Sequence, residues 1–535
     1  MISTIFSFRR LVFFFSRVLL KRSKSVHRNC SNAHASQLKV QSYSSLIQRL
    51  ELSNHTLIFD VEGALLNSSS LFPYFMVVAF EAGSLIRALI LFVLYPAICL
   101  VSEETALKIM VMVCFCGIKK KSFRVGKSVL PKFFMEDVGM EGFEVLRRGG
   151  KKVGMSDLPQ VMVESFLRDY LEIEFVVGRD LKVFCGYFVG LMEHKKKTAL
   201  EDICHCQDGK MAFPSIGISS LHKSVDHHTF SLCKEIYLVS EGDKRKWHQL
   251  PRDRYPKPLI FHDGRLAFRP TPLATLALFI WLPFGFALAI VRAFIALSLP
   301  YNVAIPLLAF TGMQLKLSKH NSLHSDSKPK ENKPPKGLLY VCNHRTLLDP
   351  LFLSYGLKRP FTAVTYSLSR LSELLAPIRT VRLTRDRDQD GKMMENLLNQ
   401  GDLVVCPEGT TCREPYLLRF SPLFSELSDG VVPVAMDASV SMFYGTTAGG
   451  FKCLDPFFFL MNPCPSYTVQ ILDQVCCVSS YGDGAKSRID VANFVQSELG
   501  KALGFECTRF TRKDKYLILA GNEGIVSAGD RPYNY

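Results

Sequence analysis

The chain has 535 residues, carries a formal net charge of +16 and is 48% hydrophobic. This length exceeds what one hydrophobic core usually organises, so we expect at least two domains. Positive charge with high apolar content favours an anionic membrane surface or anionic substrates, and without a zinc-finger, aromatic RNA-binding or basic-helix pattern we expect no nucleic-acid partner. The sixteen cysteines have no regular spacing, which indicates reduced thiols. Residues 204–206 read Cys-His-Cys without a second pair at finger spacing, so we expect no metal site.

The first fifty residues contain no acid; the first one is Glu51. Basic residues such as Arg9, Arg17 and Lys21 alternate there with Ser, Phe and Leu. This pattern is typical of a mitochondrial transit peptide or a basic amphipathic helix on a membrane surface, and a disordered basic tail is the plainer alternative. We assign residues 1–50 to a targeting or membrane-surface segment, and we expect the membrane of the endoplasmic reticulum or the mitochondrion.

The first predicted domain covers residues 51–265. Its first strand, residues 56–60, ends in Asp60, and a second acid, Glu62, precedes a glycine turn. A carboxylate at such a strand end can act as a nucleophile toward phosphate, with a second acid two residues later. A further strand near residue 152 leads to Ser156, whose hydroxyl could bind phosphate.

These residues resemble the motifs of the haloacid-dehalogenase-type phosphatases, whose first motif is Asp-x-Asp-Gly-Thr. The resemblance implies a Rossmannoid α/β fold. Glu62 replaces the second Asp and Ala64 replaces the Thr, which misplaces the proton-donating acid and removes an orienting hydroxyl. Residues 217–220 carry hydroxyls where the family has magnesium-binding acids. We therefore predict a degenerate domain without phosphatase activity.

Two apolar segments follow from the hydropathy pattern. Residues 72–101 form an insertion that is broken by Glu81 and Arg87, which suits a buried or interfacial helix. Residues 273–291 are uncharged and would span about 28 Å as a helix, with Pro283 inside and Arg292 at the end. We interpret residues 266–315 as membrane-embedded helices, and a buried helical pair in a soluble domain is the alternative. Residues 316–336, rich in Lys, Ser, Asn and Pro, are expected to be an exposed linker.

The last predicted domain, residues 337–535, contains four blocks. In the first, a strand-length apolar run precedes His344, and Asp349 lies five residues further on. A neutral imidazole held by a carboxylate can take a proton from an alcohol. In the second, Arg382 and Arg385 crowd the end of a short strand, as phosphate-binding guanidinium groups would. Alone, the first block also suits a capped turn or a packed pair, and the second a solvated loop.

The third block, residues 404–420, is a strand that runs into a Pro-Glu-Gly-Thr turn. Glu408 can bind an alcohol hydroxyl, Gly409 lets the backbone approach a ligand, and Thr410 offers a hydroxyl. Arg413 and Arg419 add charge that could bind phosphate. The fourth block, residues 431–435, is an apolar strand that lines an acyl channel or belongs to the core.

Together the blocks resemble the glycerolipid acyltransferases, with their Asn-His-x4-Asp and Pro-Glu-Gly-Thr motifs. More narrowly, the order of domains is similar to the land-plant glycerol-3-phosphate acyltransferases, over roughly residues 54–521. The resemblance implies an α/β acyltransferase domain that transfers an acyl group from acyl-coenzyme A to glycerol 3-phosphate. It also implies a preference for the sn-2 hydroxyl and a link to extracellular lipid polyesters such as cutin. Because the phosphatase motifs depart from the family pattern, the product should remain lysophosphatidic acid.

This interpretation gives each residue a role. His344 is the general base and Asp349 fixes its tautomer. Arg385 and Arg413 bind the phosphate, with Arg382 and Arg419 as further candidates, while Glu408 and Gly409 place the glycerol. No cofactor is expected beyond acyl-coenzyme A as co-substrate. The alternatives are acylation of lysophosphatidic acid, a lipid phosphatase, or a silent membrane scaffold.

Overall fold

The computed structural model describes residues 39–49, 52–193, 215–221, 233–319, 337–366, 373, 376–428, 430–477 and 487–523. Most of the basic amino-terminal segment, residues 204–206 and residues 320–336 of the expected linker lie outside this part of the chain. The chain divides into two compact units, Met1–Pro258 with Pro270–Leu276, and Leu259–Arg269 with Ala277–Tyr535. Each unit is described by itself.

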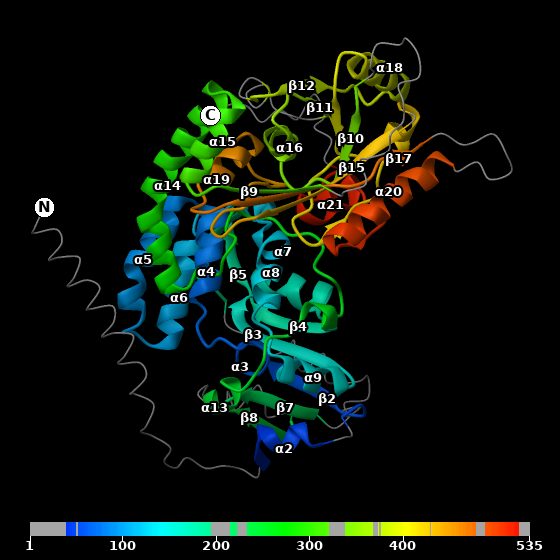
Figure 1. The fold of residues 1–535 in the computed structure, drawn as a ribbon. Helices are drawn as coiled ribbons and strands as arrows, with labels where there is room; N and C mark the ends of the chain where they lie inside the picture. The colour runs from blue at the N-terminus through cyan, green and yellow to red at the C-terminus, as the bar shows by residue number, and fades with distance from the viewer. Residues whose placement is uncertain are drawn as a thin grey trace, which may run out of the picture. The chain divides into compact units, whose positions relative to one another are not determined.

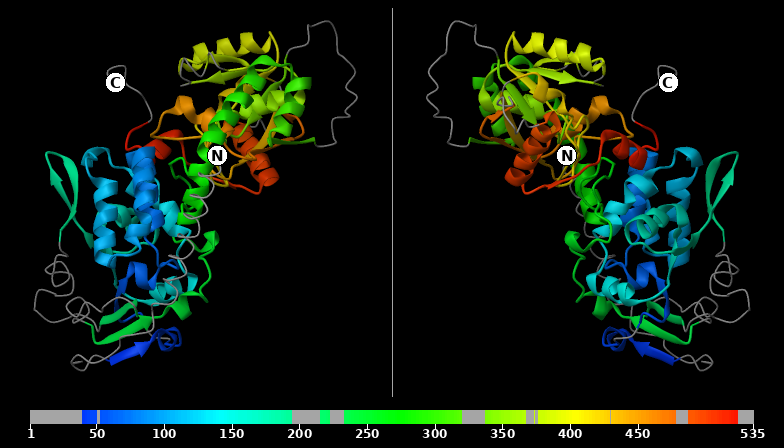
Figure 2. Two further views of the ribbon diagram at one scale, coloured as in Figure 1. Left: turned by 90° about the vertical axis from the view of Figure 1, so that its left-hand side faces the viewer. Right: turned by 90° about the vertical axis from the view of Figure 1, so that its right-hand side faces the viewer.

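The first unit is built on a six-stranded sheet of order β1-β8-β7-β2-β3-β4, in which all neighbouring strands are parallel. Parallel strands covered on both faces are apolar throughout, and four of the five residues of β2 are buried. The strands are β1 (Lys39–Ser42), β2 (Thr56–Asp60), β3 (Lys152–Pro159), β4 (Phe175–Arg179), β7 (Ser215–Ser220) and β8 (Glu235–Val239), with a hairpin of β5 (Leu181–Phe184) and β6 (Tyr187–Met192). Figure 2 shows this hairpin beside α6 (Glu103–Phe115), which it contacts.

Most helices of this unit lie between β2 and β3 in the sequence. They are α3 (Val61–Ala64), α4 (Phe72–Val78), the π-helical turn η1 (Ala79–Gly83), α5 (Leu85–Ile98), α6, η2 (Lys120–Ser122), α7 (Val125–Ser128), α8 (Leu130–Met135) and α9 (Met140–Arg148). The remaining helical segments are α2 (Tyr43–Ile47), α10 (Gln160–Ser165), η3 (Phe166–Tyr170), α13 (Glu241–Lys244) and η4 (Arg252–Arg254).

The apolar insertion at residues 72–101 contains two kinds of helix. Every residue of α4 is buried, whereas α5 exposes large apolar side chains such as Ile86 and Val93. The Ser84 hydroxyl accepts a hydrogen bond from Arg87 N and starts α5, so Arg87 lies in the first turn and does not interrupt the helix. The buried alternative therefore holds for α4, whereas α5 is partly exposed.

The second unit contains a sheet of order β12-β11-β13-β10-β15-β16-β9, with β17 paired to β15. The strands from β12 to β15 are parallel, β16 and β17 are antiparallel to β15, and β9 is parallel to β16. Its strands are β9 (Gln314–Lys319), β10 (Leu339–Cys342), β11 (Thr362–Thr365), β12 (Arg379–Arg382), β13 (Leu403–Val405), β15 (Gly430–Ser439), β16 (Ser466–Ile471) and β17 (Val475–Cys476), besides the small pair β14 (Tyr416–Leu417) and β18 (Glu506–Cys507). Figure 1 labels β9, β10, β11, β12, β15 and β17 of this sheet.

Alternating residues of the central strands fill two cores. In β10, Leu339 and Val341 pack on the side of α18 and α20, while Tyr340 and Cys342 pack on the side of α15 and α16. The helical segments are α14 (Pro272–Ser298), α15 (Tyr301–Phe310), α16 (Asp349–Leu357), α18 (Arg387–Leu398), η5 (Pro422–Glu426), η6 (Lys452–Leu454), α19 (Asp455–Leu460), α20 (Arg488–Leu503) and α21 (Arg512–Leu519). The fourth sequence block lies in β15 and belongs to these cores.

The long helix α14 differs from the expected apolar segment because it does not end at Arg292. The guanidinium of Arg292 is buried and donates to the carbonyls of Leu460 and Asn462 at 2.7 and 2.6 Å, so the charge is satisfied inside the unit. Among the described residues, α14 is the one helix long and apolar enough to cross a membrane, and 22% of its apolar window is buried. Figure 1 shows α14 leading into α15.

Two expected boundaries are corrected. The sequence placed the end of the first domain at residue 265, but Leu259–Arg269 belongs to the second unit. There His262 Nε2 lies 2.8 Å from Glu414 Oε1, and Ala448 N donates to Asp263 Oδ1 at 2.9 Å. The expected linker begins inside β9, because its first four residues pair with β16.

Candidate active site

The imidazole of His344 lies at the carboxyl end of β10. Its Nδ1 is 2.8 Å from Asp349 Oδ2, and Asp349 is the first residue of α16. Asn343, which precedes the histidine, anchors this end of the strand: its amide donates to Met436 O at 2.8 Å and accepts from Met436 N at 2.7 Å. The predicted His-Asp pair is therefore formed.

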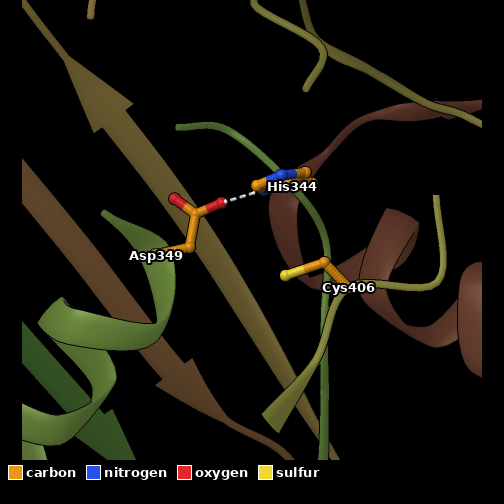
Figure 3. A group of neighbouring side chains, drawn as sticks. All are labelled: His344, Asp349 and Cys406. Carbon is orange, nitrogen blue, oxygen red and sulfur yellow. Dashed lines mark hydrogen bonds and ion pairs between the residues drawn. The ribbon is translucent and has the colours of Figure 1, made fainter. Parts of the chain in front are cut away.

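The carboxylate of Asp349 is completely buried. Its oxygens accept hydrogen bonds from the backbone N–H groups of Arg345 at 2.7 Å and Thr346 at 3.0 Å, and from the hydroxyl of Tyr467 at 2.5 Å. These donors fix the carboxylate, and the carboxylate fixes the ring of His344 (Figure 3). With its proton on Nδ1, the imidazole presents Nε2 as the acceptor, which is the form a general base needs.

The Pro-Glu-Gly-Thr turn follows β13, the parallel neighbour of β10, so both carboxyl ends meet at one edge of the sheet. Glu408 Oε1 accepts from His344 N at 2.7 Å, and its Oε2 accepts from Leu418 N at 3.0 Å. Burial raises the pKa of Glu408 to about 8, against the lowering effect of these two donors. Glu408 therefore holds two backbone segments together.

Gly409 has a φ of +64°, which only glycine adopts without strain, and a Cβ built there would meet no atom within 4 Å. The open side of this glycine faces a cavity that it helps to line. The sequence hypothesis that the backbone approaches a ligand here fits this geometry.

The thiol of Cys406 completes a group with His344 and Asp349 whose ligand atoms all lie within 4.8 Å of one another. Figure 3 shows the three side chains arriving from separate segments. Burial raises the pKa of the Cys406 thiol well above its usual value, so the neutral form is favoured, whereas metal binding needs the thiolate. Because Asp349 also has its donors in place, we assign this group to proton transfer and not to a metal.

A cavity of about 390 Å³ opens at this edge of the sheet. His344, Cys406, Gly409 and Thr410 contribute to its wall. Most of the remaining wall is apolar: Leu347, Leu348, Leu351, Leu383, Met394, Leu423, Phe424, Phe457 and Leu460. Such a lining suits a hydrocarbon chain next to a polar reacting group.

The four arginines singled out from the sequence do not line this cavity. Arg413 was expected to bind phosphate, but its side chain is engaged elsewhere. Its buried guanidinium donates to Gly264 O at 2.8 Å and to Thr446 Oγ1 at 2.9 Å and lies over the ring of Tyr444. Arg382 pairs with Glu373 at 2.7 Å.

The other two arginines are exposed. The side chain of Arg419 extends into solvent, while its backbone N–H donates to Phe510 O at 2.9 Å. Arg385 has a φ of +74°, and its backbone N–H donates to Asp390 Oδ2 at 3.0 Å. Burial and the positive charge of Arg385 lower the pKa of Arg512, a residue that does line the cavity.

Different basic residues line the cavity, namely Lys452 and Arg512, and both contact Tyr516. Behind them, Lys515 is buried and donates to Thr410 Oγ1 at 3.3 Å and Thr411 O at 2.6 Å. Lys452, Arg512 and Lys515 were not predicted from the sequence, because they lie outside the four blocks, in segments without a recognisable motif.

The phosphatase-like residues come together in the first unit. Asp60 ends β2, Glu62 lies in the following turn of helix, and Ser156 lies in β3; all three are buried. The Ser156 hydroxyl donates to Glu62 Oε1, and Lys244 Nζ donates to Glu62 O at 2.7 Å. The hydroxyl that was expected to bind phosphate is therefore bonded to the carboxylate that departs from the motif.

Comparison with protein families gives two matches. Residues 56–239 match the family model described as "Glycerol-3-phosphate acyltransferase RAM2-like, HAD-like domain". Residues 325–443 match the family model described as "Acyltransferase". The two α/β domains expected from the sequence motifs are confirmed.

Curated relatives cover nearly the whole chain. The Arabidopsis thaliana protein named "Probable glycerol-3-phosphate acyltransferase 2" is 59% identical over 525 residues, which are 96% of this chain and 97% of that protein. "Glycerol-3-phosphate acyltransferase 1" from the same plant is 51% identical over 88% of this chain and 82% of its own. "Glycerol-3-phosphate acyltransferase RAM2" from Petunia hybrida is 42% identical over 87% and 97%.

The raised pKa of Glu408 predicts a pH dependence of stability. The pKa of Glu408 is about 8 in the folded protein, against an ordinary value of 4.5, so its contribution to stability is present at low pH and declines as the pH rises from 4.5 to 8. We expect the difference in urea midpoint between the wild type and Glu408→Gln to shrink from pH 5.5 to pH 8.5. The Gln side chain does not titrate. Its NH₂ group would face one of the two backbone N–H donors unfavourably, and this cost is the same at every pH. A midpoint difference independent of pH would contradict the assignment.

Proposed function

Because the chain belongs to the land-plant glycerol-3-phosphate acyltransferase family, we propose that it transfers an acyl group from acyl-coenzyme A to a hydroxyl of glycerol 3-phosphate. The product is lysophosphatidic acid. The observation that carries this proposal is the bonded pair of His344 and Asp349, whose imidazole opens onto a largely apolar cavity. The sn-2 hydroxyl and a destination in extracellular lipid polyesters are proposed on the family resemblance alone.

The reaction begins at the imidazole. Nε2 of His344 takes the proton of the acceptor hydroxyl while the oxygen attacks the thioester carbonyl. The buried carboxylate of Asp349 holds the ring and stabilises the imidazolium that forms. When the tetrahedral intermediate collapses, the C–S bond breaks and the imidazolium returns the proton to the leaving thiolate. No acyl-enzyme is required, and this route uses acyl-coenzyme A as co-substrate without a resident cofactor.

The cavity offers an apolar part for the acyl chain of the donor next to the imidazole of His344. Leu348, Leu351 and Phe457 line an apolar part that suits the acyl chain, and His344 lies in the same wall. Burying a hydrocarbon chain against such side chains contributes about 0.8 kcal/mol per methylene group. Binding of the chain therefore places the thioester at the imidazole, which favours reaction by proximity.

We propose that the first unit has no phosphatase activity. Ser156 donates its hydroxyl to Glu62, so the carboxylate occupies the bond that a phosphate oxygen would need. Asp60 is 4% exposed and Glu62 is 7% exposed, which leaves little access for a substrate. Ala64 supplies no hydroxyl at the motif's last position. These features support lysophosphatidic acid as the final product.

We also propose that the protein is bound to a membrane of the endoplasmic reticulum or the mitochondrion. Along α14, Phe284, Ile290 and Phe294 are 65%, 51% and 65% exposed. Large exposed apolar side chains on one long helix are typical of a surface that meets lipid. The acid-free amino-terminal segment and the overall positive charge support an anionic bilayer as the partner.

The catalytic assignment predicts that His344→Ala lowers the rate of acyl transfer to glycerol 3-phosphate about 10²–10⁴-fold, because the hydroxyl loses its general base. The assay measures coenzyme A release by the purified full chain with glycerol 3-phosphate or lysophosphatidic acid as acceptor. His248→Ala, at an exposed histidine of the first unit, is the matched control and should retain the rate. A His344→Ala enzyme with more than a tenth of the wild-type rate would rule out this base. Activity with lysophosphatidic acid alone would favour the other acceptor.

The phosphatase prediction concerns the same purified chain. Incubated with lysophosphatidic acid and Mg²⁺, it should release no phosphate above the level of Asp60→Asn, because the Ser156 hydroxyl is already bonded to Glu62. Magnesium-dependent release that Asp60→Asn abolishes would overturn the proposal.

The membrane prediction uses three substitutions on α14. Combined Phe284→Gln, Ile290→Gln and Phe294→Gln should reduce recovery of the full chain with anionic vesicles in flotation, because burial of these side chains in lipid is lost. Ile489→Gln, at a similarly exposed position of α20, is the control. Equal flotation of the triple variant and the wild type would show that this face of α14 does not contact lipid.

A further inference from the structure

A group of cationic side chains gathers around Tyr516 at the cavity wall. Lys452 Nζ donates to the Tyr516 hydroxyl at 2.5 Å and lies 4.6 Å from the centre of its ring. The guanidinium carbon of Arg512 lies 5.3 Å from the same ring centre. All three residues line the cavity that also holds His344.

Lys452 brings a positive charge to this wall of the cavity. Within the described part of the chain, no carboxylate forms an ion pair with Lys452, whose printed side-chain partner is Tyr516. The one acid in the cavity wall, Asp455, is bonded to Arg265 at 2.7 Å and accepts from Thr447 N at 3.2 Å. Two cationic side chains, Lys452 and Arg512, therefore line the wall next to Tyr516.

The pKa of the Tyr516 hydroxyl responds to the same positive charges. Burial acts to raise the pKa of its hydroxyl, but the charges of Lys515 and Lys452, the hydrogen bond from Lys452 and the charge of Arg512 outweigh it, and the net shift is downward. Cationic side chains that favour the negative charge of a tyrosinate at this wall would also favour the negative charge of a bound anion.

We propose that Lys452 and Arg512 bind the phosphate group of the acceptor. This inference rests on the proposed function and specifies the residues that select a phosphorylated alcohol. A lysine supplies a compact charge and an arginine a planar fork of donors, and together they suit a phosphate monoester. The acceptor hydroxyl is then delivered to His344 in the same cavity.

The arginines of the sequence blocks are less suited to this role. Arg413 is buried in bonds to Gly264 and Thr446, and Arg382 is paired with Glu373. Arg385 does not line the cavity, and its positive charge, together with burial, lowers the pKa of Arg512. The phosphate site therefore combines residues from η6 and α21, which follow the four blocks in the sequence.

Phosphate groups occur in both substrates, because coenzyme A carries them as well. The experiment separates the two by measuring the Michaelis constants of sn-glycerol 3-phosphate and of acyl-coenzyme A for the same variants. Lys452→Met and Arg512→Gln should each raise the constant for glycerol 3-phosphate about 10- to 100-fold, as expected for a lost charge-assisted hydrogen bond. The turnover number and the constant for acyl-coenzyme A should change less than about threefold, because the phosphate contact exists before the transition state.

Two further variants serve as controls. Lys452→Arg keeps the charge and should restore most of the affinity for glycerol 3-phosphate. Lys501→Met removes an exposed lysine of α20 that pairs with Glu498 and should leave both constants unchanged. Thermal unfolding of each variant identifies any loss of folding. If Lys452→Met does not fold, Lys452→Arg alone is compared with the wild type. A folded Lys452→Arg enzyme that binds glycerol 3-phosphate tenfold more weakly would contradict a charge requirement.

The outcomes are distinct. An unchanged constant for glycerol 3-phosphate in both Lys452→Met and Arg512→Gln would overturn the inference while leaving the acyltransferase function intact. An increase confined to acyl-coenzyme A would assign the residues to the donor and also overturn it. A wild-type enzyme that is inactive with glycerol 3-phosphate would refute the proposed function, and this inference with it.

Discussion

The buried carboxylate of Asp349 is the constraint on which the active site depends. A charge with no exposure to water is stable in a protein only when donors replace its hydration. His344, Arg345, Thr346 and Tyr467 supply those donors from the loop, from its backbone and from β16. Because these partners converge on one carboxylate, they hold the loop after β10 in place and orient the imidazole of His344.

This constraint extends across the sheet edge. Glu408 accepts from the backbone of His344, so the loop after β13 is tied to the loop after β10 by a second carboxyl group. Asn343 ties the same point to β15 through Met436. The reacting group is therefore positioned by strands on both sides of β10. Rigid support of this kind is what places a general base within reach of a substrate hydroxyl.

Part of this arrangement could be predicted from the sequence. The sequence identified His344 and Glu408 as site residues that each follow an apolar strand, and the parallel pairing of these strands brings the two residues to one edge of the sheet. Arg413 was misassigned because the sequence does not show that residues 259–269 pack against it and that Gly264 and Asp263 satisfy its charge. Lys452 could not be found by spacing, since it meets Arg512 and Tyr516 only through tertiary folding of segments about sixty residues apart.

The first unit shows that the parallel sheet and the residues of the phosphatase-like site have different requirements. Its parallel sheet needs only buried apolar strands, and these are present regardless of which acid follows β2. The site is more demanding: when Glu62 replaces the shorter acid, its carboxylate reaches the hydroxyl of Ser156 and binds it. Lys244 then anchors the backbone of the same residue. A polar cluster that is satisfied internally stabilises this edge of the sheet, so the fold of the domain does not depend on the proposed absence of phosphatase activity.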